Sequence, residues 1–142
     1  MRAADSVLLL LALASLPGCV HRFAEPRARA VDLKYGHDQS ESRTLSALAA
    51  LELAVAHYRA DKGAPPPRLS DVAPRFLPKI PPAQVDLPGH GPNAEVAVYA
   101  AGEDPGRDTG GWGYRPATGE VFVDCTHLSS RGKPWNRERG AL

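Results

Sequence analysis

Residues 44–82 constrain the fold more than any other part of this sequence. The first half of the stretch carries apolar side chains at spacings of three and four, the pattern of an amphipathic helix: Leu45, Leu48, Leu51, Val55 and Tyr58. Basic side chains gather near its end, where the helix dipole favours them, and Gly63 can adopt the left-handed conformation that ends a helix. We therefore expect a helix that begins between residues 39 and 44 and ends near Gly63.

The segment after Gly63 predicts an extended crossing over this helix. Three consecutive prolines at residues 65–67 impose an extended path, because proline fixes φ and lacks an N–H. Ser70 can cap a short turn. The apolar residues of the crossing are placed to contact the helix: Leu69, Val72, Phe76, Leu77 and Ile80. A helix followed by such a crossing needs a sheet to cover.

The C-terminal half supplies that sheet. Residues 94–99 predict one strand, and two further runs, 112–115 and 120–124, flank four residues suited to a type I turn closed by Gly119. If Arg115 lies opposite Glu120, four side chains share the face that we assign to the helix: Trp112, Tyr114, Val121 and Val123. We expect an α+β fold in which one N-terminal amphipathic helix packs on a small three- to four-stranded antiparallel sheet.

The N-terminus predicts export and lipidation. The apolar run over residues 7–16 follows Arg2 and is shorter than the about 20 residues of a membrane span. Residues 16–19 read Leu-Pro-Gly-Cys, which resembles a bacterial lipobox. We expect a signal peptide over residues 1–18 and a diacylated Cys19, with an ordinary cleaved signal or an uncleaved anchor as alternatives. Val20, by resemblance to typical lipoproteins, favours the outer membrane facing the periplasm over the inner membrane.

Charge and periodicity set the remaining boundaries. Residues 19–37 mix acidic and basic side chains without helical or strand periodicity, so we expect a flexible tether. The domain would occupy residues 38–130, and residues 131–142 would form a solvated basic tail, with Trp135 folded back onto the sheet as an alternative. The formal net charge is +1, and residues 1–18 contain one base and one acid, so the mature chain is no more basic. A nucleic-acid partner is therefore not expected.

Several of these patterns resemble the soluble headgroup of a type II secretion pseudopilin of the major, G-type class, a type IV pilin-like family. The resemblance covers residues 44–126. It rests on residues 58–63, on residues 111–121, and on the positions between them: Pro66, Leu69, Asp71, Pro74, Phe76, Leu77, Ile80, Pro81 and Asp86. It implies a pilin-like headgroup that serves secretion or pilus machinery as a non-catalytic structural or interaction component.

One departure from that family is large. Pseudopilins begin with a prepilin-peptidase site and a long apolar helix half that spans the membrane and packs the filament. This chain has a lipobox and a tether instead. We therefore expect its helix to insert into no filament core.

Cys125 and His127 are the residues with the chemistry of a nucleophile and a base. With Cys19 acylated, Cys125 has no disulfide partner in its own chain, so it is either buried or reactive. On an extended strand Cys125 and His127 point to the same side, as a catalytic pair or a metal half-site would require. No glycine elbow or oxyanion site accompanies them, so we expect a buried cysteine beside a surface histidine and no enzyme. The alternative is a small periplasmic enzyme or metal-dependent factor that uses both residues.

Two further sets of residues are candidates for binding. Glu103, Asp104 and Asp108 lie in a glycine-rich loop and offer the oxygen ligands that calcium uses, with a solvated acidic turn as the simpler interpretation. No other cofactor is expected. The residues that we expect to contact a partner protein of the envelope or secretion machinery are three: Trp112, Trp135 and His127.

Overall fold

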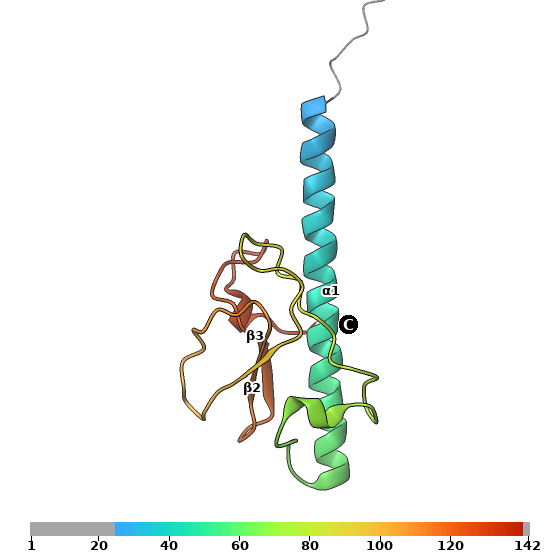
Figure 1. Cartoon of the computed structure of the whole chain (residues 1–142), viewed down its shortest axis with the longest axis vertical. Coiled ribbons are helices and arrows are strands. Elements are labelled where there is room, and N and C mark those ends of the chain that lie inside the picture. Colours follow the sequence, from blue (N-terminus) through green and yellow to red (C-terminus); the bar gives the residue numbers. More distant parts are fainter. Residues whose placement is uncertain (1–24, 141–142) are drawn as a thin grey trace, which may run out of the picture.

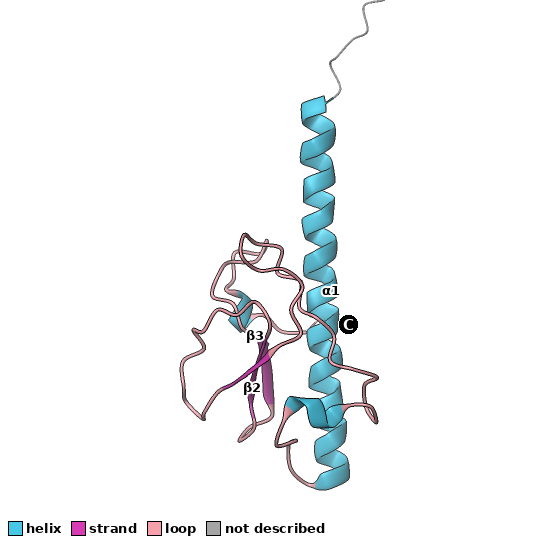
Figure 2. Ribbon diagram, viewed as in Figure 1, coloured by secondary structure: helices cyan, strands magenta, loops and turns pink. Residues whose placement is uncertain are grey.

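One long helix and a three-stranded sheet form the fold (Figure 1). The computed structural model describes the backbone of residues 25–140 and the side chains of residues 38–140. The helices are α1 (Glu25–Lys62) and two short 3₁₀ helices, η1 (Leu69–Val72) and η2 (Trp135–Arg137), and the strands are β1 (Val96–Val98), β2 (Trp112–Arg115) and β3 (Glu120–Val123). Loops and turns make up most of the remaining domain (Figure 2).

The end of α1 matches the sequence prediction, but its start does not. Gly63 has a φ of 79° and donates its N–H to the carbonyl of Arg59 at 2.8 Å, which closes the helix. The sequence predicts a start between residues 39 and 44, whereas α1 begins at Glu25. Residues 25–37, predicted as tether, are therefore helical, and residues 1–24 with the predicted signal peptide and Cys19 lie outside the described residues.

The missing apolar stripe explains this error. A helix needs an apolar stripe only where it packs on other elements. Residues 25–37 extend past the end of the domain, where no sheet lies beside them (Figure 1). Good helix formers such as alanine, leucine, arginine and lysine, with Pro26 near the first position, suffice for helix formation there. No helix within residues 25–140 combines the length and the apolar character that crossing a bilayer requires.

The sheet is mixed rather than antiparallel. Its order is β1-β2-β3, with β1 parallel to β2 and β2 antiparallel to β3. A parallel pair needs a long crossover connection, and residues 99–111 provide it. The β2–β3 hairpin is confirmed: Arg115 pairs with Glu120 and Trp112 with Val123, and Gly119, at a φ of 78°, closes the turn onto the carbonyl of Arg115 at 2.8 Å.

The core lies between α1 and one face of the sheet. The predicted face is confirmed, because all four of its side chains are at most 2% exposed: Trp112, Tyr114, Val121 and Val123. They pack with buried residues of α1 and of the crossing: Leu45, Leu48, Leu51, Ala54, Val55, Leu69 and Val72. Two hydrogen bonds fix the crossing on the sheet, from Tyr114 Oη to Pro66 O at 2.6 Å and from Trp112 Nε1 to Pro81 O at 2.7 Å.

The second face of the sheet is covered by the crossover loop. Phe122 packs over Gly113, where a Cβ atom would overlap the phenyl ring. Tyr99 lies beside Phe122, with ring centroids 5.3 Å apart, and the guanidinium of Arg115 lies 4.9 Å from the Phe122 ring centroid. Residues 99–111 therefore shield this face, and both sides of the β2–β3 hairpin are largely buried.

Residues 131–140 belong to the domain, which corrects the prediction of a solvated basic tail. Trp135 is 2% exposed, and its N–H donates to the carbonyl of His127 at 3.0 Å. Glu138, also 2% exposed, accepts a hydrogen bond from Ser129 Oγ at 2.6 Å. A Cβ atom at Gly140 would overlap Ala49 of α1. Trp135 buries its large apolar ring while the basic side chains around it stay exposed, so the domain extends past residue 130.

Candidate functional site

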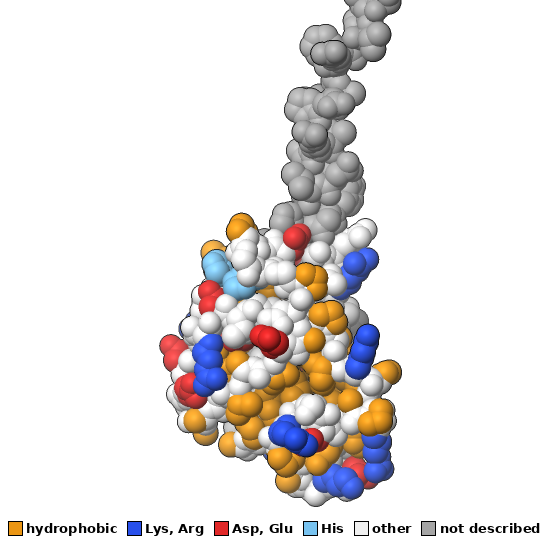
Figure 3. Space-filling model, viewed as in Figure 1, with side chains coloured by type: hydrophobic (Ala, Val, Ile, Leu, Met, Phe, Trp, Pro, Cys, Tyr) orange, Lys and Arg blue, Asp and Glu red, His pale blue; other side chains and the backbone are white. Residues whose placement is uncertain are grey.

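Four side chains with metal-binding chemistry converge at one end of the sheet. They are His90, Asp108, Cys125 and His127, and one ligand atom from each lies within 4.8 Å of all the others. The residues come from three separate segments of the chain: the turn before β1, the crossover loop, and the exit from β3. Figure 3 shows histidine side chains (pale blue) together on the molecular surface, beside an acidic group. We call these four residues the His-Asp-Cys-His cluster.

His90 is fixed by a tight turn and by a glycine. Its N–H donates to the carbonyl of Leu87 at 2.9 Å. Its ring packs against Gly110, where a Cβ atom would lie 2.5 Å from His90 Nδ1, so only glycine leaves room for the imidazole. The side chain is 10% exposed, and Nδ1 is buried without a hydrogen-bond partner among the described residues. Nε2 faces Asp108 and lies 4.0 Å from its Oδ1.

Asp108 occupies the centre of the cluster. Its φ of 58° is in the left-handed region, which costs energy for a residue other than glycine. Oδ1 accepts the N–H of Thr126 at 2.8 Å, and Oδ2 lies 3.5 Å from His127 Nδ1. Burial by itself raises the pKa of Asp108, but the Thr126 N–H, His127, the Cys125 thiol and His90 together hold that pKa below its ordinary value.

The other two predicted calcium ligands have different surroundings. Glu103 pairs with Arg107 at 3.0 Å and accepts the N–H of Ala100 at 2.8 Å, and Asp104 lies beside it in the loop. Asp108 instead faces the two histidines. A calcium loop formed by Glu103, Asp104 and Asp108 stays a prediction from the sequence.

Cys125 is buried, as one of the two sequence interpretations requires. Its side chain is 1% exposed, and Sγ lies 3.4 Å from His127 Nδ1, so the predicted same-side arrangement is present. Burial, with a smaller contribution from the carboxylates of Asp108 and Asp124, raises the pKa of the Cys125 thiol to about 11 despite the N–H of His127. His127 itself remains 51% exposed, which opens the cluster to solvent on one side.

Sequence reasoning finds half of this cluster. His90 is missed, and Asp108 is assigned to a different site. The available indication for His90 is its position in residues 88–92, where a lone histidine stands among glycines and prolines in a turn. Its approach to Cys125 depends on how that turn packs on Gly110, which no local pattern reports.

The two tryptophans predicted to contact a partner are core residues. Trp112 is 0% exposed and donates its indole N–H to Pro81, and Trp135 is 2% exposed beside β3. Their large apolar rings stabilise the small core instead of forming a contact surface. The remaining candidate, His127, is at the surface.

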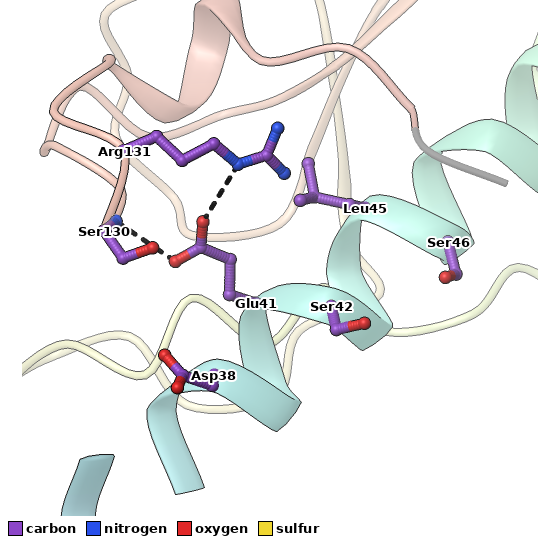
Figure 4. Close-up of a pocket in the computed structure, with 7 residues that line it drawn as sticks. All are labelled: Asp38, Glu41, Ser42, Leu45, Ser46, Ser130 and Arg131. Atoms are coloured by element: carbon purple, nitrogen blue, oxygen red, sulfur yellow. Dashed lines mark hydrogen bonds and ion pairs between the residues drawn. The ribbon is translucent and has the colours of Figure 1, made fainter. Parts of the chain in front are cut away.

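A hollow of about 310 Å³ lies between α1 and the loop that follows β3 (Figure 4). Seven residues line it: Asp38, Glu41, Ser42, Leu45, Ser46, Ser130 and Arg131. The carboxylate of Glu41 accepts the N–H of Ser130 at 3.1 Å and pairs with Arg131 Nε at 3.5 Å. Glu41 therefore attaches the loop to the helix, and its charge is already compensated.

Comparison with protein-family models gave no match, and comparisons with curated proteins and with solved structures gave no similar protein. The resemblance to pseudopilins therefore stays a prediction that rests on the sequence motifs. The structure establishes the coarser class, an α+β fold with one helix on a mixed three-stranded sheet.

Proposed function

We propose that this protein is a non-catalytic, lipid-anchored component of the bacterial cell envelope that holds a pilin-like headgroup away from the membrane on a helical stalk. The observation that carries the proposal is the length of α1. Its described core residues lie between Leu45 and Val55, whereas the helix begins at Glu25 and projects beyond the domain (Figure 1). At 1.5 Å per residue, residues 25–37 alone add about 20 Å of stalk.

The predicted lipid would attach the N-terminal end of the stalk to the membrane. Cys19 would be attached only a few residues before α1, so the helix would set the distance between headgroup and membrane. Several acyl chains, at about 0.8 kcal/mol per buried methylene, make such attachment effectively permanent. The residue after Cys19 favours the outer membrane, with the headgroup in the periplasm. The pseudopilin-like motifs favour a partner in secretion or pilus machinery.

Exposed apolar side chains on the headgroup support an interaction role. Leu53 is 48% exposed, Val98 is 50% exposed and Leu128 is 60% exposed. Leu128 follows the His-Asp-Cys-His cluster directly. Val98 lies on β1, at the edge of the sheet, where strands are open to pairing with another chain.

The alternative function, a small periplasmic enzyme or metal-dependent factor using Cys125 and His127, has the cluster in its favour. Against a nucleophilic role stands the position of the thiol, which is 1% exposed and is enclosed by the protein. A substrate carbonyl has no access to Sγ in this arrangement. The cluster therefore supports the metal-dependent part of the alternative and not the catalytic part.

Lipid labelling tests the anchor. In a bacterial host with lipoprotein processing, the wild-type chain should incorporate radiolabelled palmitate and fractionate with membranes, and Cys19→Ala should lose both properties. Cys125→Ser is the matched control, because it removes the other cysteine and should leave labelling unchanged. Persistent labelling of Cys19→Ala would overturn the anchor.

Site-specific photocrosslinking tests the interaction role. A photoreactive residue at Leu128 or Val98 should give a discrete adduct in intact cells, and the same residue at Ala60, on the exposed end of α1, should give none. Identification of an envelope or secretion protein in that adduct is the expected result. Absence of any position-dependent adduct would contradict the proposal.

A further inference from the structure

We propose that His90, Asp108, Cys125 and His127 form a four-coordinate Zn²⁺ site, which joins the turn before β1, the crossover loop and the exit from β3. The proposal concerns a site that the lipid anchor does not need, so it can fail or hold independently of the proposed function.

The distances within the cluster agree with tetrahedral coordination. Zinc bonds of 2.0–2.3 Å to nitrogen, oxygen and sulfur separate neighbouring ligand atoms by about 3.3–3.7 Å. Cys125 Sγ lies 3.4 Å and Asp108 Oδ2 lies 3.5 Å from His127 Nδ1, while His90 Nε2 lies 4.0 Å from Asp108 Oδ1. Small side-chain rotations bring all four atoms onto one ion, because none is farther than 4.8 Å from another.

The donor set selects among metals. One thiol, two imidazoles and one carboxylate form the mixed nitrogen, sulfur and oxygen set that zinc binds, whereas calcium and magnesium take oxygen ligands. The soft sulfur donor, Cys125, and the two imidazoles also exclude a purely electrostatic cation site. The ion expected here is thus Zn²⁺ and not the calcium that the acidic loop alone indicates.

His90 provides an independent observation. Its side chain is nine-tenths buried, yet Nδ1 has no hydrogen-bond partner among the described residues and Nε2 is too far from Asp108 for a hydrogen bond. A buried imidazole without partners is costly. Coordination through Nε2, the nitrogen that faces Asp108, would give this imidazole a partner on that side, while Nδ1 stays packed against Gly110.

The surroundings hold the ligands in place. The N–H of Thr126 fixes Asp108 through Oδ1 and leaves Oδ2 directed at His127. Such outer contacts orient metal ligands and are part of a built site. The backbone of Cys125 is fixed by a hydrogen bond, because its carbonyl accepts the N–H of Asn136 at 2.9 Å. The exposed edge of His127 gives the ion a path from solvent.

Four protein ligands complete a tetrahedron and leave no position for a substrate or a reactive water. The site is therefore structural. It would connect three segments that are otherwise held by a few hydrogen bonds, next to the exposed Leu128. Zinc would thereby fix the surface that the headgroup presents to a partner.

Metal titration of the full-length chain in detergent tests the site. After treatment with a chelator, the protein should bind one Zn²⁺ per chain in competition with a chromophoric chelator. Co²⁺ should give the visible absorption of tetrahedral cobalt together with a thiolate-to-cobalt charge-transfer band. His127→Ala should bind Zn²⁺ more than tenfold more weakly, and Cys125→Ser should lose the charge-transfer band.

His57→Ala is the matched control, because His57 is exposed on α1 and is not one of the four proposed ligands. It should bind Zn²⁺ like the wild type. Since His127 is exposed, its replacement should leave the fold intact, which circular dichroism can verify. Equal affinity of His127→Ala and His57→Ala, or a folded wild type without stoichiometric Zn²⁺, would overturn the proposal.

Discussion

Thr44 connects α1 to the segment that leads toward His90, and its replacement gives the sharpest test of how this fold is held. The side chain is 0% exposed. Its Oγ1 donates to Gln84 O at 2.9 Å and accepts the N–H of Gln84 at 2.8 Å, so one hydroxyl satisfies both backbone groups of a residue 40 positions away. We expect this pair of hydrogen bonds to determine where the chain crosses the helix.

Two substitutions separate the hydroxyl from the methyl group. Thr44→Val keeps the shape and removes both hydrogen bonds, which leaves the N–H and the carbonyl of Gln84 unpaired. At about 1–3 kcal/mol for each of these two unsatisfied groups, we expect a loss of about 2–6 kcal/mol. Thr44→Ser keeps both hydrogen bonds and removes one buried methyl group, for which about 1 kcal/mol is expected. Helix propensities of the three residues are similar and do not decide the comparison.

Urea denaturation followed by tryptophan fluorescence measures both losses, because Trp112 and Trp135 are buried in the folded state. The expected order is wild type, then Thr44→Ser, then Thr44→Val. A serine variant as unstable as the valine variant, or less stable, would refute the reasoning. That result would assign the role of Thr44 to methyl packing.

Two further substitutions test the sheet. Gly113→Ala should destabilise the domain by about 3 kcal/mol, because its Cβ would overlap the Phe122 ring, whereas Gly106→Ala, with no atom within 4 Å of its Cβ, should be nearly neutral in thermal denaturation. Burial raises the pKa of Tyr114 to about 12, so the folded state keeps this proton longer than the unfolded state. The stabilisation is full below about pH 10 and is lost as the pH rises toward 12, by about 2–3 kcal/mol. Tyr114→Phe should remove this part of the alkaline destabilisation, and Tyr58→Phe, at a partly exposed position, should retain it in denaturation curves measured against pH.

Local chemistry predicts the hairpin and the end of the helix. Gly119 and Gly63 both adopt the positive φ that their positions in the sequence indicate, at 78° and 79°. The parallel pairing of β1 with β2 has no such local determinant. It requires the crossover loop of residues 99–111, which returns the chain to the end of the sheet where β1 began.

The extent of α1 shows a different limit of sequence reasoning. Periodicity identifies the part of a helix that packs on a core, and for α1 that part begins near Thr44. Residues 25–37 are helical without an apolar stripe, because this part of α1 projects past the domain (Figure 1). A helical stalk and a flexible tether can therefore have the same amino-acid composition. Only the backbone conformation, which is helical over residues 25–37, distinguishes the two.

The His-Asp-Cys-His cluster shows both the success and the limit of sequence reasoning. Cys125 and His127 lie just after β3, two residues apart, and their side chains meet on one side as the sequence predicts. His90 reaches the same point by packing on Gly110, and Asp108 does so by accepting the N–H of Thr126, 18 residues away. Both contacts join residues that are distant in the sequence. The contacts with Gly110 and Thr126 place His90 and Asp108 beside Cys125 and His127. Zinc bound there, as we propose, would hold together the loops beside the exposed Leu128.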